Sequence, residues 1–456
     1  MTYRSINPFT EQVVAEHPEH SDTETEAILA RAEETYRSSW SRMSYAERGR
    51  VLAAAADLMH ERREDLARLA TTEMGKRCTE LLWEVDLCVE ILRYYAAHAE
   101  RILAPRPLEV AAGSARIEAN PLGVIFCIEP WNFPFFQLVR VAAPIVMAGN
   151  TMILKHAPSV PGCALAVEQI FTDAGAPAGV YANVFLTDDQ CAALIADDRI
   201  KGVALTGSER AGAAVAATAG RALKKITLEL GGSDAFLVLD DADLDLAVSI
   251  AVASRTMNTG QGCACSKRFI VHSSLYDAFL ERFTEAFEAL VAGDPMDDAT
   301  DVGPLASEAG LARALGQIDL ARTHGAKVVT GGHRMEREGF FLEPTVLTGV
   351  TPDNPVFRQE IFAQVAMVFS VDSDEEAIEL ANNSPYGLGG SVMSADVERA
   401  ESVAARMDTG MVFINRVGDA GPTLPWGGVK NSGFGRGLSD FGIGEYVNWK
   451  LIRTGA

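Results

Sequence analysis

The sequence has few cysteines, and their spacing indicates neither disulfide pairs nor a metal site. Seven cysteines are scattered over 456 residues, too few for a disulfide framework and without paired zinc-ligand spacing. No apolar run approaches the roughly 18 residues of a membrane span, and the polar start Met1–Arg4 does not resemble an apolar signal region. We therefore expect a cytoplasmic protein with reduced thiols, no metal site and no membrane association.

Basic residues are also in deficit. The sequence has 40 Lys and Arg against 62 Asp and Glu, which gives a formal net charge of −22. A field of this sign disfavours nucleic acid and anionic membrane surfaces as partners. The chain also lacks internal repeats and low-complexity segments, so we expect an ordinary globular protein.

Apolar patterning predicts an α/β fold. Capping boxes that begin at Ser21 and Ser44 precede helical runs in the N-terminal third, and a long helix is expected from Cys78 to Leu103. From Gly123 to about Ile414, short apolar runs alternate with helical segments, which is typical of βαβ units on parallel sheets. The expected strands are Val124–Ile128, Met152–Leu154, Asn183–Leu186, Gly202–Leu205, Ile226–Leu230, Ala235–Leu239 and Phe269–Val271.

Cys263 is the strongest candidate for chemistry. It follows the helical stretch Leu244–Met257 in a glycine-rich turn, and Lys267 and Arg268 place positive charge nearby. Positive potential and partial exposure favour the nucleophilic thiolate. Glu229 ends a predicted strand among apolar neighbours, where burial would raise its pKa and make it a proton acceptor. A cysteine with a nearby base is the minimum set for acyl chemistry through a covalent intermediate.

A strand-to-helix junction at Thr206–Gly212 offers a second candidate site. Free N–H groups and the positive dipole end of a helix suit a pyrophosphate there, although the segment lacks the GxGxxG pattern and could be only a turn. Lys155 ends another predicted strand, on the edge of an open α/β sheet where ligands bind.

Several short segments occur in one order along the chain, and together they resemble the aldehyde dehydrogenase superfamily over essentially its whole length. These segments are Pro130–Pro134 (PWNFP), Lys155, Thr206–Ser208 (TGS), Glu229–Gly232 (ELGG), Gly260–Cys263 (GQGC), Glu360–Phe362 (EIF) and Pro425–Gly433 (PWGGVKNSG). The resemblance implies oxidation of an aldehyde through a thiohemiacetal and a thioester on Cys263. Asn132 would stabilise the oxyanion together with the Cys263 backbone N–H, and Glu229 would activate the hydrolytic water. The implied cofactor residues are Trp131, Lys155, Gly207, Ser208, Glu360 and Phe362.

Within the superfamily, the likeness is nearest to succinate semialdehyde dehydrogenases. The second cysteine of the loop, Cys265, belongs to their usual pattern, and so does Arg140, whose guanidinium would pair with the distal carboxylate of the substrate. Met257 stands where many of these enzymes carry another arginine, so glutarate semialdehyde or a neutral aldehyde stays open. A CoA-acylating enzyme and a non-catalytic structural protein are remoter alternatives. Cys265 either fills space beneath the loop or forms a regulatory disulfide with Cys263.

Departures from the family pattern bear on the cofactor. Pro158 occupies the position where NAD-preferring members often carry a Glu that would repel a 2′-phosphate, so we expect NADP to be accepted, with NAD possible. Gly437 replaces the customary Glu after Gly435–Arg436, and Ala363–Gln364 replaces Gly-Pro.

The resemblance implies two parallel-sheet α/β domains and a small oligomerisation element. The expected cofactor-binding domain takes residues 1–107 and 125–231, the catalytic domain residues 232–431, and the oligomerisation element residues 108–124 and 432–456. The alternating tail Tyr446–Ile452 would need a partner edge, so we expect a homodimer or homotetramer.

Overall fold

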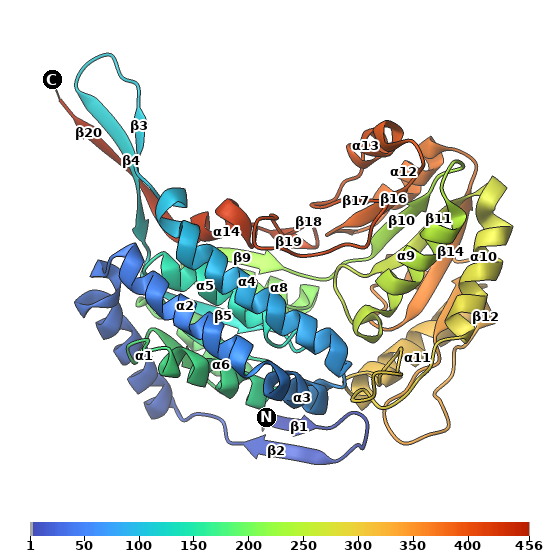
Figure 1. Ribbon diagram of the computed structural model, residues 1–456, viewed down its shortest axis with the longest axis horizontal. Helices are drawn as coiled ribbons and strands as arrows, with labels where there is room; N and C mark the ends of the chain where they lie inside the picture. The colour runs from blue at the N-terminus through green and yellow to red at the C-terminus, as the bar shows by residue number, and fades with distance from the viewer. Residues whose placement is uncertain (1–2, 456) are drawn as a thin grey trace.

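The computed structural model describes residues 3–455 and contains two separate β-sheets covered by helices, with a strand arm that projects from the body (Figure 1). The chain passes from the first sheet to the second after Glu229. The α/β class predicted from the patterning is confirmed. The exact domain ranges remain a prediction.

The first sheet has the strand order β19-β9-β8-β5-β6-β7 and is parallel except for β19. Its strands are β5 (Val124–Glu129), β6 (Thr151–His156), β7 (Tyr181–Asn183), β8 (Ile200–Thr206), β9 (Lys225–Glu229) and β19 (Gly433–Phe434). The connecting helices are α5 (Phe136–Met147), α6 (Pro161–Asp173), α7 (Asp188–Ala196) and α8 (Glu209–Arg221). The predicted alternation holds, although α7 was not predicted.

Helices of the N-terminal third pack beside this sheet. They are α1 (Asp22–Ser38), α2 (Tyr45–Glu61), α3 (Arg63–Met74) and α4 (Cys78–Ile102), and they follow the hairpin β1 (Tyr3–Ile6) and β2 (Val13–His17). Reciprocal hydrogen bonds of Ser21 with Glu24 and of Ser44 with Glu47 confirm both capping boxes. One core includes buried side chains of α2, α3, α4 and α5, and it fixes α5 beside the sheet.

The second sheet has the order β12-β13-β14-β11-β10-β16-β17 and is parallel except for β12. Its strands are β10 (Asp234–Val238), β11 (Ser266–His272), β12 (Lys327–Thr330), β13 (Thr345–Thr348), β14 (Val365–Val371), β16 (Gly390–Met393) and β17 (Phe413–Ile414). Its helices are α9 (Leu244–Thr256), α10 (Ser273–Glu288), α11 (Glu308–Thr323), α12 (Asp374–Asn382) and α13 (Val397–Ala404). Every residue of β10 is buried, as expected of a strand covered on both faces.

Short elements complete the described chain. They are the 3₁₀ turns η1 (Trp40–Arg42), η2 (Met257–Gly260) and η3 (Pro355–Arg358), the paired strands β15 (Tyr386–Gly387) and β18 (Val429–Lys430), and helix α14 (Ser439–Gly444). None of the helices among residues 3–455 combines the length and the apolar character that a membrane crossing requires.

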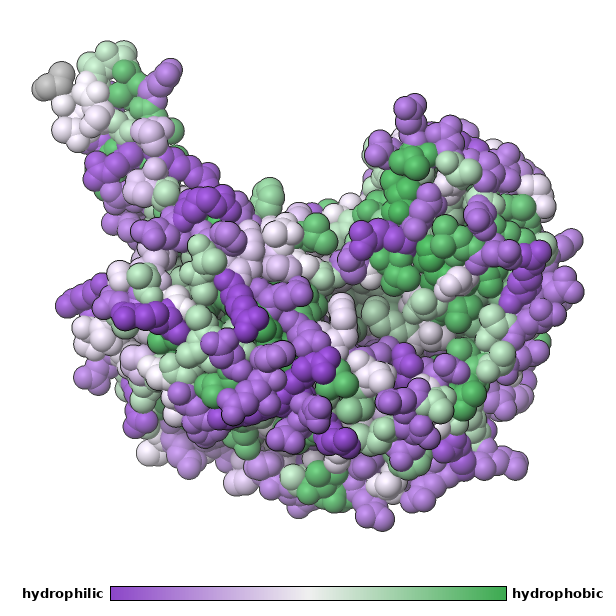
Figure 2. All heavy atoms as spheres, in the orientation of Figure 1, coloured by the Kyte–Doolittle hydropathy of each residue, from purple (hydrophilic) through white to green (hydrophobic). Residues whose placement is uncertain are grey.

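The arm is a sheet of β3 (Arg106–Leu108), β4 (Ser114–Pro121) and β20 (Val447–Thr454), in the order β20-β4-β3. The C-terminal strand therefore finds a partner within its own chain, and its other edge faces outward. Apolar side chains on the arm, including Trp449 and Leu451, are exposed, and green atoms are visible near its tip (Figure 2). An open edge with apolar side chains is a pairing surface.

Candidate active site

The loop that carries Cys263 holds a constrained backbone. Asn258 and Thr259 have φ values of 49° and 54°, and Gly260 follows at 74°. This left-handed region is costly for a β-branched residue, so the surrounding structure must enforce it. The Asn258 amide N–H donates to Glu80 at 2.9 Å, and its side chain donates to the Asn132 carbonyl at 2.7 Å. These bonds tie the loop to α4 and to the turn that carries Asn132.

The charges around Cys263 differ from the sequence-based prediction. Lys267 is fully buried, and its ammonium donates to the backbone carbonyls of Gly262, Cys263 and Cys265. The Arg268 guanidinium is occupied elsewhere, by the carbonyls of Ser233, Leu380 and Ala381. Burial raises the pKa of the Cys263 thiol to about 12, although the charge of Lys267 opposes the rise. The charge of Lys267 favours the thiolate, as predicted, but burial outweighs it, so the thiol must lose its proton when it attacks.

Cys265 is fully buried beneath the loop. Its Sγ lies 3.6 Å from the Met257 carbonyl, and both Cys263 and Cys265 are free thiols. The space-filling interpretation fits this placement, and the regulatory disulfide stays a prediction.

Two cavities meet at Cys263. The first is mainly apolar and is lined by Trp83, Leu87, Phe133, Phe136, Gln137, Met257, Gly262, Cys263, Ala264, Gly418, Asp419, Ala420 and Trp426; we call it the substrate funnel. The second is lined by Pro130, Trp131, Asn132, Gln137, Thr206, Gly207, Ser208, Leu230, Gly231, Cys263, Arg313, Glu360 and Phe362; we call it the cofactor groove. Cys263 and Gln137 belong to both, so the sulfur lies where a substrate and a cofactor would meet.

Asn132 lies in the groove beside Cys263. Its Nδ2 donates to the Gln261 carbonyl at 3.0 Å, and its buried Oδ1 has no hydrogen-bond partner among the described residues. The hydrogen bond of Nδ2 fixes the orientation of the Asn132 amide, and stabilisation of the oxyanion by Asn132 remains a prediction.

The groove has the features that a dinucleotide cofactor requires. Ser208 caps α8, whose free N–H groups suit a pyrophosphate, and Gly207 precedes it without a side chain. The Glu360 carboxylate accepts from the Gly232 amide at 3.1 Å and can also accept from ribose hydroxyls. The rings of Trp131 and Phe362 meet edge to face with centroids 5.9 Å apart.

One predicted cofactor residue lies outside this groove, and two groove residues, Gln137 and Arg313, were not predicted. Lys155 is near the end of β6, partly exposed, with its ammonium 5.8 Å from the Tyr3 ring centroid. Its contact with the adenosine ribose stays a prediction. Arg313, on α11, lines the groove, and no sequence motif pointed to it.

The structure gives Arg140 partners within the protein, and its pairing with a substrate carboxylate stays a prediction. Its guanidinium does not line the substrate funnel but forms a buried ion pair with Glu229. It also donates to Thr206 Oγ1 at 2.5 Å and to Gln137 Oε1 at 2.7 Å. The sequence could place Arg140 on a helix after the PWNFP motif, but the direction of its side chain depends on partners from other strands.

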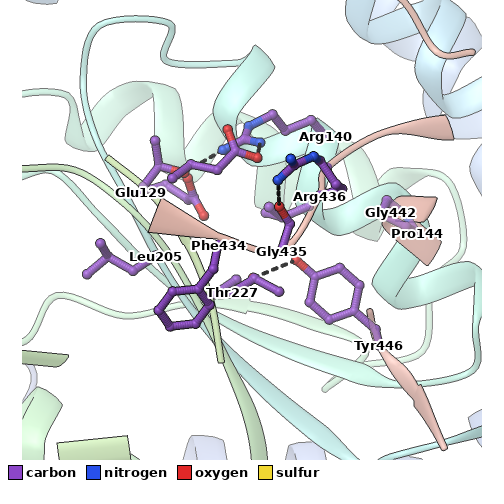
Figure 3. Close-up of a pocket in the computed structure, with 15 residues that line it drawn as sticks. Glu129, Arg140, Pro144, Leu205, Thr227, Phe434, Gly435, Arg436, Gly442 and Tyr446 are labelled. Atoms are coloured by element: carbon purple, nitrogen blue, oxygen red, sulfur yellow. Dashed lines mark hydrogen bonds and ion pairs between the residues drawn. The ribbon is translucent and has the colours of Figure 1, made fainter. Parts of the chain in front are cut away.

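Glu229 is a buried carboxylate, as predicted, and it is paired with Arg140. Burial raises its pKa, and the charge of Arg140 opposes the rise. It lines neither the funnel nor the groove, only a third cavity behind them, which Arg140 and Glu129 also line (Figure 3). Its predicted role in water activation is not tested by this geometry.

Comparison with known proteins gives consistent matches along the chain. A family model described as "Aldehyde dehydrogenase family" matches residues 1–452. A Deinococcus radiodurans protein named succinate-semialdehyde dehydrogenase (NADP+) is 48% identical over 99% of this chain and 94% of its own. A Synechocystis protein named probable succinate-semialdehyde dehydrogenase (NADP+) is 45% identical over 99% of each chain. A solved succinic semialdehyde dehydrogenase from Streptococcus pyogenes, in complex with NADP+, superposes with a TM-score of 0.98 at 45% identity over 100% of both chains.

Proposed function

The chain belongs to the aldehyde dehydrogenase family, and from this premise we propose that it oxidises succinate semialdehyde to succinate with NADP as the hydride acceptor. The observation that carries the proposal is the position of Cys263, which lines both the substrate funnel and the cofactor groove. The names of the relatives from Deinococcus radiodurans and Synechocystis, and the NADP+ complex from Streptococcus pyogenes, support the choice of substrate and cofactor.

The funnel suits a short aldehyde with a distant negative charge. Its walls are aromatic, including Trp83, Phe133 and Trp426, and no Lys or Arg lines it. A neighbouring outer cavity shares Trp83 and Phe133 with the funnel, and its lining includes the ion pairs Arg77–Glu80 and Arg416–Asp419. Arg140 is paired with Glu229 inside the protein, whereas the Arg416 side chain is 59% exposed, so we place the distal carboxylate at this mouth, where it would compete with Asp419 for Arg416.

The residues of this chain supply the acyl chemistry. The Cys263 sulfur bonds to the aldehyde carbon as the thiol loses its proton, and the Asn132 amide and the Cys263 backbone N–H stabilise the oxyanion; losing one such donor costs about 3–4 kcal/mol of barrier. When bound, the nicotinamide accepts a hydride. Glu229 then takes a proton from the water that hydrolyses the thioester on Cys263.

Gly207, Ser208, Trp131, Glu360 and Phe362 would hold the cofactor. Pro158 stands where NAD-preferring members of the family often carry a Glu, and the lack of that carboxylate favours acceptance of a 2′-phosphate. We place Lys155 at the adenosine ribose or its phosphate.

We further propose that the enzyme is a cytoplasmic homodimer or homotetramer. The open edge of β20 and the exposed apolar side chains of the arm support an interface between copies.

The test is a substrate and cofactor panel on the purified chain. Succinate semialdehyde, glutarate semialdehyde and butanal would each be assayed with NADP and with NAD, and with and without CoA. The proposal predicts the highest kcat/KM for succinate semialdehyde with NADP and no dependence on CoA. A higher kcat/KM for butanal would contradict the proposed substrate, and a requirement for CoA would contradict hydrolysis by water.

A further inference from the structure

The cavity behind the active site, which we call the rear cavity, gathers side chains from three neighbouring strands. Glu129 ends β5, Thr206 ends β8 and Glu229 ends β9, and these strands are adjacent in the sheet. Arg140 reaches in from α5 and contacts both Thr206 and Glu229 (Figure 3). The rear cavity is therefore lined by two carboxyl groups, Glu129 and Glu229, and by the guanidinium groups of Arg140 and Arg436, and Arg140 is paired with Glu229.

Glu129 is the member of this cluster without an assigned role. Both its carboxyl oxygens are buried and have no hydrogen-bond partner among the described residues. Burial raises its pKa to about 8, while Arg140 and the Thr206 hydroxyl oppose the rise and Glu229 adds to it. With Glu129 protonated, Arg140 and an ionised Glu229 neutralise each other, so a single buried ion pair remains.

Other titratable groups around Glu129 stay neutral near pH 7. Burial lowers the pKa of His156 to about 3 and raises the pKa values of Cys127, Tyr181 and Tyr446. Glu129 is thus the neighbour of Arg140 that can become a carboxylate and balance the positive charge of Arg140 when Glu229 no longer does so.

Gly437 makes room for the ion pair. A Cβ at this position would lie 2.8 Å from Arg140 Nη1 and 2.9 Å from Glu229 Oε1, so any side chain would collide with the pair. The glycine stands where the family usually has glutamate. The observed position of Glu229 therefore depends on the absence of a side chain at position 437.

We propose that Arg140 holds Glu229 in a resting position away from Cys263, and that Glu129 is a positioning residue that replaces Glu229 as the counter-ion of Arg140 when Glu229 moves to the thioester. The proposal rests on the aldehyde oxidation proposed above but not on the identity of the aldehyde.

The exchange balances for one hydrolysis. Glu229 leaves Arg140, and Glu129 releases its proton to solvent and pairs with Arg140. Glu229 takes a proton from water as the water oxygen bonds to the acyl carbon. The carbon–sulfur bond then breaks, and the thiolate takes the acid proton of the product. Protonated Glu229 returns and transfers its proton to Glu129, so the net release is one proton and one carboxylate.

The test measures acylation and deacylation separately in the variant Glu129→Gln. Glutamine has the shape of the carboxyl group but cannot ionise, so it cannot compensate Arg140. Stopped-flow absorbance at saturating NADP and aldehyde gives the NADPH burst, and the later steady rate reports deacylation. We expect an unchanged burst, a steady rate reduced by about tenfold or more, equivalent to about 1.4 kcal/mol, and loss of the ionisation near pH 8 from the pH profile of that rate.

Glu168→Gln is the matched control, because Glu168 is also a glutamate whose pKa is raised by burial but accepts from Asn183 and lies outside the rear cavity. It should leave both phases unchanged. An unchanged steady rate and pH profile in Glu129→Gln, or equal slowing of the burst and the steady rate, would overturn the proposal.

Gly437→Ala provides a second variant in case Glu129→Gln does not fold. Its methyl group should displace the Arg140–Glu229 pair and alter the steady rate without altering the burst, and an unaltered steady rate would equally overturn the proposal. The wild-type enzyme would also be assayed with butanal, to separate failure of this proposal from failure of the proposed substrate. If the wild type gives a normal NADPH burst with butanal and shows no preference for succinate semialdehyde, only the proposed substrate is contradicted.

Discussion

Replacement of Arg140 by methionine tests where this guanidinium acts. Methionine keeps an unbranched apolar stem but removes the charge and the bonds to Glu229, Thr206 and Gln137. Because Arg140 is 2% exposed, its removal leaves the Glu229 carboxylate buried without its counter-ion. Removing one partner of a buried pair typically costs about 3–5 kcal/mol of unfolding free energy.

The kinetic expectation for Arg140→Met follows from the same contacts. Arg140 does not line the substrate funnel, so kcat/KM should fall by similar factors for succinate semialdehyde and for butanal. A direct bond to the distal carboxylate would instead give a selective loss of about 1.5–3 kcal/mol, which is roughly 10- to 150-fold for the charged aldehyde alone.

The assay combines initial rates for both aldehydes with urea unfolding near pH 7. A loss confined to succinate semialdehyde, together with unchanged unfolding free energy, would refute the structural reasoning and restore the role predicted from the sequence. Lysine at position 140 is the matched comparison, because it keeps the charge but cannot contact Glu229, Thr206 and Gln137 together.

Further predictions concern the catalytic groups and their ionisation. Cys263→Ala should abolish oxidation while fluorescence titration shows nearly unchanged NADP binding, and Glu229→Gln should retain the NADPH burst but slow the steady rate; loss of the burst would count against water activation. Because the Glu129 pKa rises from 4.5 unfolded to about 8 folded, the folded state holds the extra proton between these values. Wild-type unfolding free energy should therefore fall as pH rises through this window, by at most about 1.4 kcal/mol per pH unit from this group, and urea unfolding of Glu129→Gln should show a shallower fall. If Cys265 protects Cys263, dithiothreitol should restore the activity of the wild type after peroxide treatment but should not restore that of Cys265→Ser. Equal recovery of both, with no Cys263–Cys265 crosslink by mass spectrometry, would leave Cys265 as a space-filling residue.

The amino-acid sequence determined the architecture because the relevant signals are local. The helix expected from Cys78 to Leu103 is α4 (Cys78–Ile102), and the capping boxes at Ser21 and Ser44 occur as expected. Each depends on residues a few positions apart, for which periodicity and side-chain capping are sufficient. The order of the short segments that resemble the family likewise pointed to Cys263 and to most residues of the cofactor groove.

Tertiary structure alone decided the charges within the site. Lys267 and Arg268 are adjacent to the cysteine loop in sequence, yet their charged ends bind backbone carbonyls, and burial leaves the Cys263 thiol protonated. Arg140 meets Glu229 across 89 positions of sequence, and Glu129 joins them only because β5, β8 and β9 are neighbours in the sheet. The pKa of a buried group depends on its desolvation and on the charges around it, and neither is a property of nearby sequence.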